Sequence, residues 1–375
     1  MQQPTDEPRN TMTDDSVIHL IQNANSVIIG KGLELLTMGL ELTEDISTDF
    51  RSGSVSRSSY ATLHGTANFS ITRQLDWGRS IVRPYYIIES TEVRARFNLG
   101  AYYTSTPKRN TGEFPITYDV VGYDIIHGLA DTVGEVYALN AGTNYLTAIE
   151  QILIERGYSR YSINQSASSK TLPTPKIWVM DERTTWLSII NDLLSSIGYS
   201  GVWSDWNGTL HCEPYVNPSD KGPEWYYTSD QATSMLGPNR EIHKDFYDAP
   251  NRWVAVRSNV VDGATPVDGN GIYTYTNEFD GETSVSARGG RVITRYLSLE
   301  AADHASLVSQ AQIAINADML RKAKIVVSTF PNPLHWHFDR VLINDPALGP
   351  IMDALVTQWT LPLNGDDMSQ EWSVL

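Results

Sequence analysis

Alternating apolar and polar residues dominate the stretch 61–103. In "LHGTANFSI" the apolar residues Ala67, Phe69 and Ile71 share one parity, and "EVRARFNLG" alternates in the same way. A period of two places these side chains on one face of a strand, so both stretches are predicted to be strands with one buried face. "DWGR" between them predicts a turn, and "SIVRPYYIIES" another strand. Residues 25–126 are therefore expected to form a β-domain, either a barrel or a sandwich.

The apolar period changes to that of a helix in the middle of the chain. "GTNYLTAIEQILIERGYS" and "RTTWLSIINDLLSSIGYS" each place apolar residues on one helical stripe. Gly157 and Gly198 are expected to end these helices, because glycine adopts the left-handed conformation at little cost. A third helix is predicted over about 299–323, and "KIVVSTF" and "IMDALVTQWTLPL" are predicted to be the closing strands. The order is β, then α/β, then β with one helix, which predicts an α+β protein that is mainly β.

The stretch "GYSGVWSDWNGTLHCEPY", residues 198–215, combines aromatic, acidic, His and Cys side chains. We expect "GVWSD" and "TLHCE" to be strands joined by a two-residue turn at "NG". This register places Trp203 opposite Cys212, with Trp206 beside the turn. Trp225 follows a few residues later. The three Trp residues are therefore candidates either for stacking on a sugar or for packing in a core or a subunit contact.

Composition narrows the class of protein. The chain has 375 residues, enough for two or three domains, and its formal net charge of −16 disfavours tight binding to a nucleic-acid backbone. An acidic wall would nevertheless let DNA slide past. The single Cys212 excludes an internal disulfide framework and a Cys-based zinc site. "MQQPTDEPRNTMTDD" lacks the pattern of a signal peptide and no long apolar run follows, so we expect synthesis in a cytosol without a cleaved leader or a membrane segment.

No motif in the sequence predicts catalysis. Nucleophile-elbow, phosphate-loop, dinucleotide-binding and H-E-x-x-H motifs are absent. His335 and His337 share one side of a predicted strand, but no third ligand lies nearby, so a metal site is not expected. Carboxylates beside aromatic residues are compatible with a glycosidase, but no short signature supports one. We therefore predict no catalytic residues, no cofactor and no metal, and a binding or structural protein rather than an enzyme.

Several stretches, taken in their order and spacing, resemble a known family. They are "ITRQLDWGRSIVRPYY", "FNLGAYYTSTPKR", "YDVVGYDIIHGLAD", "AGTNYLTAIEQIL", "TTWLSIINDLLSSIGYSGVWSDWNGTLHCEPYV", "DFYDAPNRWVAV" and "VTQWTLPL". Over roughly residues 60–375 they resemble the tail hub proteins, or baseplate hub and tail-tip minor tail proteins, of long-tailed bacteriophages that infect actinobacteria.

The resemblance implies an architecture and a set of partners. Two tube-type β-barrel or β-sandwich domains at 25–126 and 239–375 would flank an α/β insert at 127–238, after a flexible N-terminal arm at 1–24. A homotrimer would form a pseudo-sixfold ring that links the tail tube and the distal tail protein to tail-tip or fibre proteins, around the end of the tape-measure protein. DNA would be only a transient passenger of the channel during ejection. The protein would be assembled in the host cytoplasm and would reside in the virion, at the tail tip or baseplate.

Three functions remain open at the level of the sequence. The first is the structural hub. The alternative is a tail-tip glycan-binding protein for host adhesion that uses Trp203, Trp206 and Trp225. The third is a wall-degrading enzyme, which the absence of a catalytic motif and of any lysozyme-like or peptidase-like module disfavours.

Overall fold

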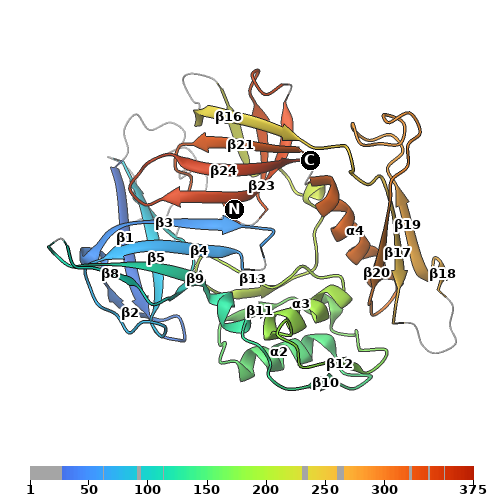
Figure 1. Cartoon of the computed structure of the whole chain (residues 1–375), viewed down its shortest axis with the longest axis horizontal. Coiled ribbons are helices and arrows are strands. Elements are labelled where there is room, and N and C mark those ends of the chain that lie inside the picture. The colour runs from blue at the N-terminus through green and yellow to red at the C-terminus, as the bar shows by residue number, and fades with distance from the viewer. Residues whose placement is uncertain are drawn as a thin grey trace.

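The protein is described from a computed structural model. The described residues are 28–61, 63–90, 94–112, 114–229, 235–259, 266–320, 323–336, 338–349 and 351–375. The predicted N-terminal arm at 1–24 and His337 lie outside them. The chain is an α+β protein that is mainly β, as the alternation of apolar residues predicts. Figure 1 shows the N-terminal strands in blue beside the C-terminal strands in red, with the helices α2 and α3 below them.

Nine strands lie in the described residues of the N-terminal part. Its elements are β1 (Ile28–Leu36), β2 (Leu42–Asp45), η1 (Ser47–Asp49), β3 (Phe50–Ser58), β4 (Gly65–Ile71), β5 (Ile81–Glu89), β6 (Arg94–Asn98), β7 (Tyr102–Thr104), β8 (Lys108–Asn110) and β9 (Thr117–Asp124). The predicted alternation is confirmed in β4, where Ala67, Phe69 and Ile71 are buried, and in β6, where Ala95 and Phe97 are buried. These side chains belong to a core that the N-terminal strands share with the C-terminal strands.

The C-terminal strands continue the same hydrogen-bonded sheet. They are β15 (Trp225–Thr228), β16 (Leu236–Lys244), β21 (Ala323–Thr329), β22 (Arg340–Asn344), β23 (Met352–Pro362) and β24 (Met368–Val374). The sheet runs in the order β16-β21-β24-β23-β3-β4-β9-β7-β5-β1-β2, so the antiparallel pair β23–β3 joins the two halves. The two predicted closing strands are confirmed as β21 and β23, whereas β22 and β24 were not predicted. β15 and the start of β16 precede residue 239 yet belong to this sheet, and the domain limits stay predictions.

The insert between the two halves contains two helices and short strands. Its elements are η2 (Ile125–Leu129), β10 (Tyr137–Leu139), α2 (Tyr145–Glu155), β11 (Tyr161–Ile163), η3 (Gln165–Ala167), β12 (Lys176–Trp178), α3 (Trp186–Ser196), β13 (Trp203–Ser204), β14 (Leu210–Cys212) and η4 (Pro218–Asp220). The predicted helix ends are confirmed, because Gly157 and Gly198 follow α2 and α3 with φ angles of 83° and 80°. The apolar stripes of both helices pack into a second core together with Cys212.

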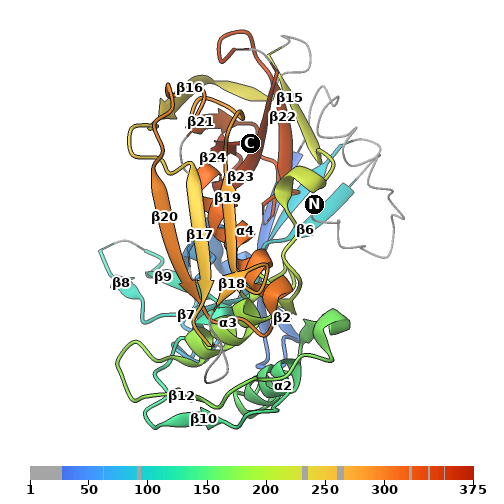
Figure 2. The same cartoon turned by 90° about the vertical axis from the view of Figure 1, so that its right-hand side faces the viewer.

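A separate small sheet carries the third helix. Its elements are β17 (Arg252–Arg257), β18 (Val267–Asp268), β19 (Gly271–Thr276), β20 (Thr294–Leu299) and α4 (His304–Leu320). The predicted start of this helix at 299 was wrong, because Leu299 pairs with Arg257 in the sheet. Ser306 N donates to Asp303 Oδ1 at 2.8 Å, so Asp303 caps the true first turn. Figure 2 shows β17, β19 and β20 side by side, with α4 on the face of the sheet that points toward the rest of the molecule.

The hairpin formed by β13 and β14 differs from the prediction in its register. Trp203 pairs with His211 and Ser204 with Leu210, whereas the prediction paired Trp203 with Cys212. The Trp203 ring stacks on the His211 ring, with centroids 4.5 Å apart and an interplanar angle of 17°. Cys212 instead packs into the core of the insert.

The loop of this hairpin explains the shift of one residue. Asp205 N donates to Thr209 O at 2.9 Å, so three residues, not two, form the loop. Gly208 adopts a φ of 87°, which a three-residue loop requires at its last position. The loop packs on the first β-domain, where a Cβ on Gly208 would lie 2.7 Å from Ala101 Cβ and 2.9 Å from Leu40 Cδ1.

We predict that Gly208→Ala destabilises the protein by about 2 kcal/mol or more, because the left-handed conformation disfavours a Cβ and the new methyl group would overlap Ala101. Urea denaturation of the wild type and of the variant measures the difference in the free energy of unfolding. Gly222→Ala is the matched control, since a Cβ at Gly222 has no atom within 4 Å. Equal midpoints for the two variants would contradict the predicted docking of the hairpin loop.

Candidate functional site

A buried ion pair lies where the insert meets the first β-domain. Arg57 on β3 and Asp124 at the end of β9 are 3.3 Å apart, and their side chains are 3% and 1% exposed. Ser204 Oγ on β13 donates to both Asp124 carboxylate oxygens, at 2.9 and 2.8 Å. Arg57 Nη2 donates to Ser204 O at 3.1 Å. Asp124 also accepts a hydrogen bond from Ile126 N, so the same carboxylate caps η2.

The loop between β21 and β22 adds a fourth side chain to this group. Trp336 Nε1 donates to Ser204 O at 3.1 Å. The Arg57 guanidinium lies over the Trp336 ring, 4.0 Å from its centroid. We call Arg57, Asp124, Ser204 and Trp336 the Arg57 cluster. It connects the first β-domain, the insert and the C-terminal strands at one buried point.

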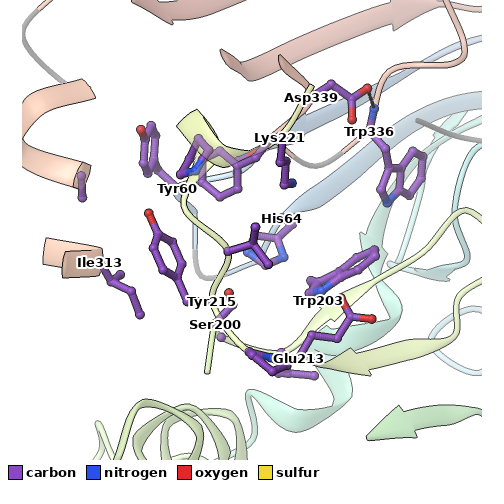
Figure 3. A pocket seen from close by; sticks show the side chains of 18 of the residues that line it. Tyr60, His64, Ser200, Trp203, Glu213, Tyr215, Lys221, Ile313, Trp336 and Asp339 are labelled. Atoms are coloured by element: carbon purple, nitrogen blue, oxygen red, sulfur yellow. Dashed lines mark hydrogen bonds between the residues drawn. The ribbon is translucent and has the colours of Figure 1, made fainter. Parts of the chain in front are cut away.

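A pocket of about 600 Å³ opens beside the Arg57 cluster. The hairpin, the loop after β3, the segment 213–224, helix α4 and the loop before β22 line it. Its aromatic walls are Tyr60, Trp203, Trp206, Tyr215, Trp336 and Phe338. Figure 3 shows Tyr60, Tyr215 and Ile313 on one side of the pocket, Trp203 and Trp336 on the other, and His64 between them. The space is thus bounded by side chains from all three parts of the molecule.

Three titratable groups in or beside the pocket have shifted pKa values. Burial, together with the nearby positive charge of Arg57, lowers the pKa of His64 to about 3, so its imidazole is neutral at physiological pH. Burial and the neighbouring Asp339 carboxylate raise the pKa of Glu224 to about 7. Burial alone would raise the pKa of Asp339, but the hydrogen bond with His335 holds it below its usual range. Asp339 therefore keeps its charge while Glu224 is partly protonated near neutral pH.

A hydrogen-bonded row behind the pocket resembles a catalytic triad only in its residue types. Tyr227 Oη lies 2.5 Å from His335 Nε2, and His335 Nδ1 lies 3.2 Å from Asp339 Oδ2. His335 is 1% exposed, and Tyr227 is equally buried in the core of the C-terminal strands. Because Tyr227 and His335 are enclosed in the core and only Asp339 borders the pocket, we assign this row a structural role.

The three predicted Trp residues do not come together on one surface. Trp203 and Trp206 are half-buried and line the pocket. Trp206 also packs edge-to-face on Trp336, with centroids 6.0 Å apart. Trp225 is 1% exposed in the core of the C-terminal strands and offers no ring face to a ligand.

The residues of the Arg57 cluster belong to no motif that the sequence pattern predicts. Asp124 carries a detectable signal, because it directly precedes "IIHGL" and an Asp in that position commonly caps a helical turn. Arg57 lies in the polar strand "FRSGSVSRS", which shows no clear alternation and gave no signal. Trp336 lies between His335 and His337 in the sequence and carries no signal of its own. Its role depends on a contact with residue 204 that no local pattern predicts.

The described residues offer little support for metal or thiol chemistry. They contain no group of three or more His, Cys, Asp or Glu side chains that could hold a metal ion. Cys212 is buried, and burial raises the pKa of its thiol to about 12, so the thiolate is scarce. None of the helices in this part of the chain is both long and apolar enough to span a membrane.

Comparison with solved structures identifies tail proteins of similar fold. A tail protein from Neisseria meningitidis superposes with a TM-score of 0.63 at 10% identity, over 92% of this chain and 97% of that one. The 43 kDa tail protein of prophage MuSo2 from Shewanella oneidensis gives 0.60 at 12% identity, over 92% and 98%. The prophage tail protein gp18 from Listeria monocytogenes gives 0.54 at 12% identity, over 91% and 94%. No family model and no curated protein matches the sequence. The chain therefore has the fold of phage tail proteins.

We predict that Asp124→Asn lowers the free energy of unfolding by about 3 kcal/mol, because it leaves the buried Arg57 charge without its counter-ion. Chemical denaturation followed by Trp fluorescence measures the change. Glu44→Gln is the control, since the Glu44–Arg73 pair lies on the surface, and it should change stability little. A loss for Asp124→Asn no larger than that of the control would contradict the structural role of the Arg57 cluster.

We predict that Glu224→Gln changes the pH dependence of stability. The native state raises the pKa of Glu224 from 4.5 to about 7, so it binds this proton more tightly than the unfolded chain, and stability falls as pH rises through that window. The Gln side chain does not titrate in this pH range. As pH rises from about 4.5 to about 8, the free energy of unfolding of the variant should therefore increase by up to about 2 kcal/mol relative to that of the wild type. This figure allows for the partial solvent exposure of Glu224. Parallel stability curves would contradict the raised pKa.

Proposed function

We propose that this chain is a structural protein of a bacteriophage tail and that it serves as the tail hub. The observation that carries the proposal is the shared fold with phage tail proteins, which extends over nearly the whole length of both chains. The resemblance of the sequence to hub proteins supports the same assignment. It extends the proposal to phages of actinobacterial hosts and to a position at the tail tip or baseplate of the virion.

The arrangement of the strands is suited to a ring. The β23–β3 pair makes the two β-halves of one copy into a single sheet. In the proposed homotrimer, two tube-type β-domains from each copy make a pseudo-sixfold ring that matches a hexameric tail tube. Such a ring needs an obligate interface, which is expected to be large and partly apolar.

The charge of the chain suits a channel for DNA. With a formal net charge of −16, the protein repels the phosphate backbone and does not retain it. The proposed partners are the distal tail protein, the tape-measure protein and tail-tip or fibre proteins, with DNA passing only during ejection. The proposal assigns no enzymatic activity to the chain.

We predict a mass of about three times the chain mass of 41.9 kDa for the purified protein. Light scattering coupled to size exclusion measures the mass, and negative-stain images of the same peak should show rings with a central hole. Serial dilution provides the control, because an obligate trimer keeps its mass over the accessible range. A monomeric mass at every concentration, with no rings in the images, would contradict the homotrimeric hub.

A further inference from the structure

The strand order of the main sheet contains the same four-strand unit twice. The first unit is β3-β4-β9-β8 and the second is β16-β21-β24-β23, and neighbouring strands are antiparallel in both. In each unit the third strand of the sheet is the last in the chain, and the fourth is the strand directly before it. The two β-halves are therefore topological repeats, which the pseudo-sixfold symmetry of the proposed ring requires.

The fourth strands of both units are interrupted in the same way. In β23, residues 352–355 pair with β22, the register shifts after Val356, and residues 358–362 pair with β3 of the other half. In the first unit β7 pairs with β5, a break at 105–107 follows, and β8 continues along β9. The part of β23 after its irregularity forms the joint, so β8 occupies the equivalent position in the first unit.

The first strands of the two units also agree. β3 and β16 each have a register irregularity near their start, between Phe50 and Ser52 and between Leu236 and Arg240. After this point β3 pairs with β4 on one side and with β23 on the other. β16 pairs with β21 on one side, but among the described residues no strand pairs with the other side of its segment 240–244.

β8 has an open side as well. Lys108, Arg109 and Asn110 pair with β9, and within the described part of the chain no strand pairs with their other side. An open strand edge presents backbone N–H and C=O groups, and a strand of another chain can satisfy them. Each copy thus has two open edges, β8 and the segment 240–244 of β16.

The two open edges of one copy cannot pair with each other. They lie at opposite ends of a row of eight strands, so about 34 Å separates them along the sheet, at about 4.8 Å per strand. Figures 1 and 2 show β16 at the top of the molecule and β8 far from it, at the left. A strand that pairs with either edge must therefore come from another chain.

The side chains of the two edges are compatible with such a pairing. Lys108 is opposite Asp119, which is exposed, so Lys108 lies on the solvent face of the sheet. Ile242 is opposite the buried Ile325, so its neighbour Glu241 lies on the solvent face as well. An antiparallel joint between the two edges would thus place opposite charges on the same face.

We infer that β8 of one copy pairs antiparallel with β16 of a second copy of this chain, as β23 pairs with β3 within each chain. The second copy is the matching partner because its β16 has the position in the repeat that β3 has at the joint within the chain. In a trimer, three joints within chains alternate with three joints between chains and close the ring. The inference rests on the proposed homotrimeric hub and extends it by naming the strands that hold the ring together.

Disulfide formation between introduced cysteines tests the joint between chains. Lys108→Cys or Asn110→Cys is combined with Glu241→Cys or His243→Cys, all on the solvent face, so the four double variants sample neighbouring registers. We expect at least one of them to form a covalent trimer on mild oxidation, which a reducing agent dissociates. The native Cys212 is buried and does not compete.

Lys108→Cys combined with Thr43→Cys is the matched control. Thr43 lies on the exposed strand β2, which the repeat does not place at a joint, so this variant should form no covalent trimer. If light scattering shows trimers but none of the four test variants becomes covalently linked, the β8–β16 pairing is wrong while the homotrimer is retained. A monomeric mass at every concentration overturns both.

Hydrogen exchange of the unmodified protein is a second measurement, and it decides the question if the cysteine variants do not fold. In the trimer, the amides of 240–244 that point away from β21 should exchange about tenfold or more slowly than the amides of β2 that point away from β1. The reason is that only the former would donate to a neighbouring copy. Equal exchange rates in a trimeric sample would overturn the inference.

Discussion

The buried ion pair between Arg57 and Asp124 is the interaction on which the arrangement of the whole molecule depends. Two charges removed from water are tolerated only when other polar groups replace their hydration. Here Ser204 supplies those groups from the hairpin, and Trp336 supplies a ring face from the C-terminal half. The pair is therefore stable only when the insert and the C-terminal loop are docked in place. A local hydrogen-bonding requirement thus specifies how distant parts of the chain pack together.

The position of this pair coincides with the joint of the sheet. In the β23–β3 pairing Arg57 is opposite Trp359, and the Trp359 ring lies 6.1 Å from the Trp336 ring. Backbone hydrogen bonds hold the two β-halves at this place, and the buried side chains attach the insert to the same place. The pocket lies between the hairpin and α4 and is bordered by Trp336. Its shape therefore follows from the docking of three units and not from any single element.

Local sequence patterns were sufficient to predict the elements in which apolar residues recur with a clear period. The alternation in β4 and the apolar stripes of α2 and α3 predicted those elements, and the glycines at 157 and 198 predicted the helix ends. The predicted hairpin register was wrong because "NG" occurs in both two-residue and three-residue loops. Here Asp205 Oδ1 accepts hydrogen bonds from Asn207 N and Thr209 N, and Gly208 packs close to Ala101, which fits the longer loop. The burial of Trp225 was not predictable, since its strand pairs with β22, which follows more than a hundred residues later.

Local sequence patterns did not predict the Arg57 cluster, because its residues lie far apart along the chain. Its members lie at residues 57, 124, 204 and 336, so only the completed sheet brings them together. The β23–β3 joint itself consists of backbone hydrogen bonds, and these do not depend on the side chains that flank them. Side chains at this joint can therefore vary while the backbone pairing of the two β-halves is kept. The scattered positions of the Arg57 cluster explain why side-chain motifs alone could not locate the site.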